Sequence, residues 1–185
     1  MDRETRIAWL VDHYHRPRHR GALADADARV PGGNPGCGDV ITMYLKGAGT
    51  GNGGGVEASR IAAVGWEGAG CTLSQAAASI LAERVNRDHP SFEEILSLPP
   101  EQLIDLLGRD IAEARPGCAL LALGTLKAAV KTVEMNRKLR AAGHSDEEIA
   151  ELRREIARQG EAAGVVVGEG AEDAAGSASP LGLVK

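Results

Sequence analysis

Apolar residues recur every three or four positions near the start of the chain. Ile7, Leu10, Val11 and Tyr14 follow the spacing of one helix face, which predicts an amphipathic helix over residues 4–15. Pro17 lies just beyond that stretch and disfavours a helical residue before it. The first predicted element is therefore a helix with one buried face.

The pattern then changes to one typical of strands. Residues 40–46 are β-branched and aromatic, and residues 60–66 give a second strand. A glycine-rich link, 47–55, joins them, which predicts an antiparallel hairpin, and residues 21–36 can add a short edge strand. A phosphate-binding loop would need a helix beginning with Lys-Ser or Lys-Thr after the glycines. A strand follows instead, so the glycines are interpreted as a flexible hairpin tip.

Helical spacing returns after residue 71 and continues to the last part of the chain. Ser91 with Glu94, and Ser145 with Glu148, are capping boxes that each predict a helix start. Gly108 and Gly143 predict helix ends. The expected helices cover residues 72–86, a short stretch after Ser91, residues 101–107, residues 119–141, and a last stretch after Ser145 that includes Ile149, Leu152 and Ile156.

These elements predict an α+β fold, a small antiparallel three-stranded sheet with helices packed on one face. Residues 1–142 form the predicted domain, and 143–160 an appended helix, which we expect to cover the long helix before it rather than to extend a dimer surface. Residues 161–185 are low in complexity and predicted to be disordered.

The composition and charge of the chain argue against several classes of function. The net charge of -5 gives no electrostatic case for nucleic-acid binding. No apolar run approaches the roughly 20 residues of a membrane span. The charged start of the chain does not resemble a signal peptide, so we expect a cytoplasmic protein with reduced thiols.

Basic residues gather after the first helix: His13, His15, Arg16, Arg18, His19 and Arg20. This basic patch has two interpretations, a solvated helix end or a docking surface for a partner. The sequence leaves both open.

The candidate chemistry lies in three cysteines and one carboxylate. Cys37 precedes Asp39 by two residues in a glycine-rich turn, and residues so spaced in an extended segment face the same side. Cys71 and Cys118 each follow glycine at a predicted helix start, where the helix dipole favours a thiolate. Lone cysteines are usually small buried hydrophobes, but glycine beside all three favours a shared metal or cluster site.

Several motifs occur together in the order of one known family. They are Asp12-His13-Tyr14 with Pro17 and Gly21, Asn34-Pro35-Gly36-Cys37-Gly38-Asp39, Glu67-Gly68-Ala69-Gly70-Cys71-Thr72-Leu73-Ser74 with Ala78-Ser79, and Cys118-Ala119-Leu120 before Lys127-Ala128-Ala129-Val130. Over roughly residues 5–135 the chain resembles the U-type iron–sulfur cluster assembly scaffolds, which comprise the NifU N-terminal domain, IscU and SufU.

The resemblance implies that Cys37, Asp39, Cys71 and Cys118 bind the metal. In such scaffolds a cysteine desulfurase delivers persulfide sulfur, a labile [2Fe-2S] cluster is built with iron, and recipient apo iron–sulfur proteins receive it. Zinc commonly occupies the same site. The family's aspartate is associated with a labile cluster.

Three departures bear on the subtype. Gly117 stands where the scaffold branch has a histidine, which leaves Asp39 as the evident fourth ligand. Leu98-Pro99-Pro100 lies 18 residues before Cys118, too far to match the family's chaperone motif, and is interpreted as a helix start. Arg115 resembles the SufU branch, whereas the 47-residue spacing from Cys71 to Cys118 is nearer the shorter scaffold branch.

Three functions follow, in order of preference. The first is a non-enzymatic assembly scaffold. The second is a zinc-dependent persulfide acceptor of the SufU kind, with Cys118 as the sulfur acceptor and Arg115 as an accessory residue. The third is a structural zinc domain, which the carboxylate ligand disfavours because closed structural sites usually use four Cys or His ligands. The oligomeric state stays open.

Overall fold

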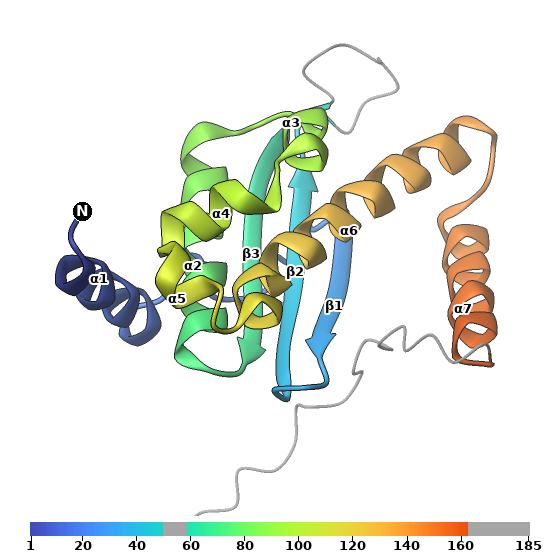
Figure 1. The fold of residues 1–185 in the computed structure, drawn as a ribbon. Coiled ribbons are helices and arrows are strands. Elements are labelled where there is room, and N and C mark those ends of the chain that lie inside the picture. The colour runs from blue at the N-terminus through green and yellow to red at the C-terminus, as the bar shows by residue number, and fades with distance from the viewer. Residues whose placement is uncertain (50–58, 163–185) are drawn as a thin grey trace, which may run out of the picture.

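A computed structural model describes residues 1–49 and 59–162, and Figure 1 shows the order of its elements. The elements are α1 (Arg3–His15), β1 (Ala28–Asn34), β2 (Asp39–Gly47), β3 (Ile61–Ala69), α2 (Thr72–Asp88), α3 (Phe92–Ser97), α4 (Pro100–Leu107), α5 (Arg109–Ala112), α6 (Pro116–Ala141) and α7 (Asp146–Ala162). Most of the expected glycine-rich hairpin tip, and the tail from residue 163 onward, lie outside the described residues.

The three strands form one antiparallel sheet in the order β1-β2-β3. The central strand β2 alternates as a half-buried strand should, and its Ile41, Met43 and Leu45 are fully buried. The predicted three-stranded sheet is confirmed. Its edge strand β1 is longer than expected, because seven residues pair with β2 from Ala28 opposite Leu45 to Asn34 opposite Asp39.

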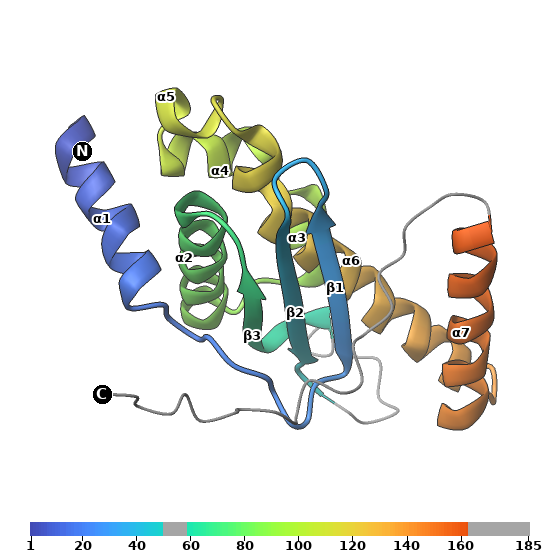
Figure 2. The same cartoon turned by 90° about the horizontal axis from the view of Figure 1, so that it is seen from below.

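Helices α2 and α6 pack over one face of this sheet (Figures 1 and 2). Both helices are rich in alanine along that face, which lets them approach the strands closely. The predicted inner face of the long helix is confirmed by the burial of Leu123, Leu126, Ala129, Val130 and Val133. Two helix starts are therefore held at one end of the sheet, beside the β1–β2 turn (Figure 2).

The predicted inner face of α1 was partly wrong. Leu10 is buried, but Ile7 and Val11 are 37% and 38% exposed, and the other buried residue is His13. His13 Nδ1 lies 2.8 Å from Ser79 Oγ of α2, and the Trp9 ring packs edge-on against the imidazole. The buried side of α1 therefore carries Leu10 and His13 and includes a polar contact to α2, instead of the full apolar stripe.

Burial of His13 also corrects the predicted basic patch. The pKa of His13 is lowered, first by burial and then by the nearby Arg18 guanidinium, although Glu83 and Asp12 act in the opposite direction. Arg18 in turn pairs with Asp12 at 2.6 Å. The exposed basic surface thus excludes His13.

Both predicted capping boxes are present, at Ser91 with Glu94 and at Ser145 with Glu148. The sequence prediction missed α5, a single turn between α4 and α6. Helix α7 contacts α6, with an Arg140–Asp146 pair at 2.7 Å, and its Ile149 is buried. Among helices in the described ranges, none is long and apolar enough to span a bilayer.

Candidate metal centre

The candidate site lies where the β1–β2 turn meets the N-termini of α2 and α6. The carbonyl oxygen of Asn34 accepts hydrogen bonds from the N–H groups of Cys37 and Gly38, at 3.0 and 2.9 Å. Gly38 has a φ of 69°, a left-handed conformation that glycine adopts at little cost. This tight turn brings Cys37 back over Asp39, the first residue of β2. The predicted glycine-rich turn at Cys37 is confirmed, but this turn, and not an extended segment, brings Cys37 and Asp39 to one site.

Asp39 is the centre of the arrangement. It is 2% exposed, and its Oδ1 accepts the backbone N–H of Cys71 at 2.8 Å, at the start of α2. A side chain at Gly70 would lie 2.5 Å from that same oxygen, so glycine there lets the carboxylate approach the helix. Burial raises the pKa of Asp39, but hydrogen bonds from Cys118, from the Cys71 backbone and from Ser74 outweigh it and lower the pKa overall.

Cys118, Asp39 and Cys37 form a compact ligand group. One sulfur or oxygen atom from each lies within 4.8 Å of the others. Zinc–sulfur bonds of about 2.3 Å place the ligand atoms of a tetrahedral site roughly 3.8 Å apart, so a small closure would bring these three atoms to the spacing of three of the four ligands. The Cys37–Asp39 pair and the distant Cys118 are thus nearly arranged for one metal.

Cys71 lies beside this group. Its Sγ is 3.6 Å from Asp39 Oδ2 and 3.6 Å from Ser74 Oγ. It is the N-cap residue of α2, as the sequence predicted, and Cys118 is the third residue of α6. Both sulfurs therefore lie near the positive end of a helix dipole, which favours a bound thiolate.

The three thiols differ sharply in exposure. Cys37 is exposed, Cys71 is half-buried and Cys118 is 1% exposed. Burial, with contacts to Asp39, Cys37 and Cys71, raises the pKa of Cys118. A metal that binds there must therefore displace a proton from a well-covered thiol.

Arg115 is the N-cap residue of α6, three positions before Cys118. Its carbonyl accepts the N–H groups of Cys118 and Ala119, both at 3.1 Å. Its side chain lines a pocket of about 470 Å³ that also includes Cys71 and the exposed Ile7 and Val11 of α1. Arg115 thus borders the approach to the site and is not in the compact ligand group.

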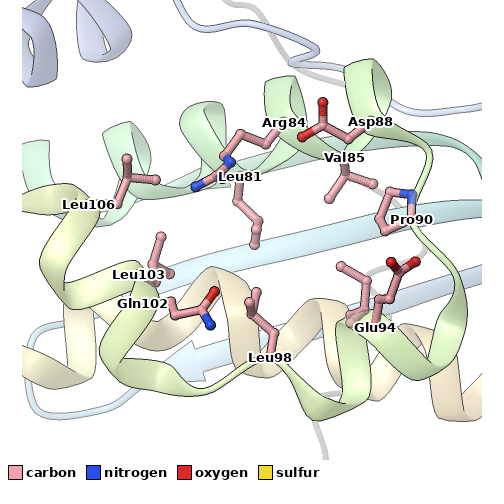
Figure 3. Close-up of a pocket in the computed structure, with 11 residues that line it drawn as sticks. Leu81, Arg84, Val85, Asp88, Pro90, Glu94, Leu98, Gln102, Leu103 and Leu106 are labelled. Carbon is pink, nitrogen blue, oxygen red and sulfur yellow. The ribbon is translucent and has the colours of Figure 1, made fainter.

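A second pocket, of about 240 Å³, lies between α2, α3 and α4 (Figure 3). Leucines from the three elements face one another there, with Arg84 and Asp88 on the α2 side. No predicted ligand lines it. It is therefore separate from the candidate metal centre.

The sequence prediction gave no role to two residues that contact ligands, Ser74 and Asn34. Asn34 Nδ2 lies 3.5 Å from Cys118 Sγ, although 84 positions separate the two residues. The only available signal was the place of Asn34 within the cysteine-bearing motif.

The fold and the site define a small α+β domain in which three cysteines lie close to one buried carboxylate, and comparison with known proteins places it in a family. The NifU-like N terminal domain family matches residues 8–140, so the chain belongs to this family. It is similar to the iron–sulfur cluster assembly scaffold protein IscU of Thermotoga maritima, with 34% identity over 67% of this chain and 91% of that protein.

Two further similarities bear on subtype and fold. The zinc-dependent sulfurtransferase SufU of Bacillus subtilis is 32% identical over 41% of this chain and 45% of that protein. The crystal structure of a NifU-like N-terminal protein from Brucella abortus superposes with a TM-score of 0.55 at 19% identity, over 69% of this chain and 92% of that one. At that identity the second similarity concerns the fold alone.

Proposed function

We propose that this protein is an assembly scaffold that builds a [2Fe-2S] cluster and passes it on. The observation that carries the proposal is the convergence of Cys37, Asp39 and Cys118 within 4.8 Å, with Cys71 beside them. Three thiols suit iron and sulfide, and the carboxylate supplies a harder donor. The cluster is the cargo of the protein, so the protein needs no substrate turnover of its own.

The proposed partners follow from this role. A cysteine desulfurase supplies sulfur, and apo iron–sulfur proteins receive the cluster. The pocket beside Cys71, with exposed Ile7 and Val11 on one wall, gives an approach for such a partner. Reduced thiols are required, which fits the predicted cytoplasmic location.

The second candidate function is zinc-dependent sulfur transfer. It is supported by Arg115 near Cys118, by Gly117 in the position of the scaffold branch's histidine, and by the similarity to SufU. In this reaction an acceptor thiolate attacks the outer sulfur of the desulfurase persulfide. The sulfur–sulfur bond breaks, the desulfurase cysteine leaves as a thiolate, and the acceptor becomes a persulfide.

The sequence predicts Cys118 as this acceptor, and its exposure of 1% sets a condition on that role. A buried thiol must be uncovered before it can react, whereas Cys37 is exposed already. Mass spectrometry of the cysteine peptides after incubation with a desulfurase would locate the added sulfur. Persulfide on none of the three cysteines would contradict sulfur transfer.

Anaerobic purification distinguishes the two functions. Bound iron and sulfide with charge-transfer bands in the visible spectrum support the scaffold. A colourless protein that holds one tight zinc ion and stimulates a desulfurase supports sulfur transfer. A protein that binds neither zinc nor iron contradicts both.

A further inference from the structure

The side chain of Asn34 lies against the most buried thiol of the site. Its Nδ2 donates a hydrogen bond to Cys118 Sγ at 3.5 Å. The backbone carbonyl of Asn34 is used separately, because it holds the turn through the N–H groups of Cys37 and Gly38. One residue thus has two distinct tasks, one in its backbone and one in its side chain.

The side-chain amide of Asn34 can lie against Cys118 because residue 117 is a glycine. A Cβ atom at Gly117 would lie 2.9 Å from Asn34 Nδ2 and 3.4 Å from its Cγ. The distance to Nδ2 is shorter than real Cβ contacts allow, so a side chain at 117 would force the amide to shift. The Asn34 side chain therefore occupies the space that a side chain at position 117 would otherwise use.

The exposure of the residues at the start of α6 is consistent with an Asn34 side chain that covers the Cys118 sulfur. Pro116 and Gly117, which precede Cys118 in the first turn of α6, are exposed, yet Cys118 itself is 1% exposed. The described contacts around its sulfur come from Asn34, Asp39, Cys37 and Cys71. Of these, only Asn34 is not a proposed metal ligand, so it alone can move away without loss of a ligand.

We propose that Asn34 is a positioning residue for Cys118: its amide holds the sulfur toward Asp39 and Cys37 and covers it from solution. The inference rests on the proposed function of the site, because it adds a residue that controls access to one ligand. Cys118 then reacts with reagents or incoming sulfur only after the Asn34 side chain has moved.

The test is site-resolved alkylation of the full chain, reduced and freed of metal under anaerobic conditions. The three cysteines fall in different tryptic peptides, so mass spectrometry gives a rate of iodoacetamide labelling for each. In the unsubstituted protein the expected order of rates is Cys37, then Cys71, then Cys118. Asn34→Ala should raise the Cys118 rate about tenfold and change the other two less than about twofold, because the loss of one hydrogen bond and its covering group opens one sulfur.

Gly117→Ala gives an independent route to the same result, since the new methyl group displaces the amide from the other side. The double variant should label Cys118 at the rate of Asn34→Ala alone, because both substitutions act on one contact. Gly124→Ala is the matched control on α6: nothing lies within 4 Å of its added Cβ, and no cysteine rate should change.

An unchanged Cys118 rate in Asn34→Ala would overturn the inference. So would additive effects in the double variant, since Gly117→Ala would then act on the helix start and not through Asn34. The measurement is made without metal, so it can succeed or fail whether or not the protein assembles a cluster. Failure of metal binding by the unsubstituted protein would instead count against the proposed function.

Discussion

The two sides of the metal centre are built differently. Cys37 stands on an exposed four-residue turn, whereas Cys118 is anchored in the first turn of a 26-residue helix and is almost fully buried. A turn can adjust its backbone at low cost, while a packed helix start cannot. The site therefore joins one adaptable thiol to one fixed thiol, with the buried Asp39 between them.

That contrast suggests a division of roles. The fixed side sets the geometry of the site, because Cys118 and Asp39 have few alternative positions. The exposed side meets solution and partners first. If this division holds, substitutions on the fixed side should have the larger effects.

Removal of the Cys118 thiol, on the fixed side, should have the largest effect, and the affected quantity is the affinity for zinc. Loss of a residue that only supports a metal ligand commonly costs 10–100-fold in affinity, so Cys118→Ser should weaken zinc binding by at least about 100-fold. Competition with a chromophoric zinc chelator measures this. Cys37→Ser, on the adaptable side, should cost less, and equal losses in the two variants would contradict the proposed division.

Asp39→Ala should lengthen the life of an assembled cluster by about tenfold, equivalent to about 1.4 kcal/mol of barrier. The reason is that a hard oxygen donor weakens an otherwise thiolate ligand shell, as the family resemblance implies. Loss of visible absorbance in the presence of an iron chelator gives the lifetime. An equally short-lived cluster would count against this role of Asp39.

His13 lies in the contact between α1 and α2, away from the candidate metal centre, and its effect is expected on stability. Its pKa in the folded protein lies below that of an exposed histidine, about 6.5. The folded chain thus binds fewer protons, so stability is complete above that pH and declines as the pH falls below it. Urea unfolding at pH 7.5 and 5.5 should show this decline.

His13→Gln provides the control for that measurement, because it keeps a polar group near Ser79 but cannot be protonated. Its stability should change less between the two pH values than that of the unsubstituted protein. An identical change in both proteins would assign the pH dependence to other groups.

The smallest effect is expected at the exposed face of α6. Gly124→Ala should raise the free energy of unfolding by about 0.5–1 kcal/mol, because alanine favours a helix and no neighbour obstructs it. Chemical denaturation measures the change. A destabilised variant would indicate a contact at that face which the described residues do not include.

The sequence was sufficient where local patterns determine the structure. The β-branched and aromatic residues of β2, the Ser91 capping box and the glycine at the end of α4 are short-range signals, and each predicted its element correctly. The ligand candidates were also found, because glycine beside each cysteine and the motif order are visible in the chain. That they bind a metal stays a proposal.

The features that the sequence did not predict depend on contacts between residues that are far apart in the chain. Ile7 and Val11 have the spacing of a buried face, but Ser79, 66 positions after His13, decides which side of α1 packs. The Asn34–Cys118 contact likewise spans 84 positions. No periodicity contains such information, since it arises only when the sheet and two helices meet.

The central claim is that Cys37, Asp39, Cys71 and Cys118 together hold a cluster that the protein builds. Anaerobic reconstitution with a cysteine desulfurase, cysteine and ferrous iron, followed by measurement of iron and acid-labile sulfide per chain, tests it most directly. We predict equal amounts of iron and sulfide in the unsubstituted protein and near-complete loss of both in Cys118→Ser. The same iron and sulfide content in both proteins would contradict the claim.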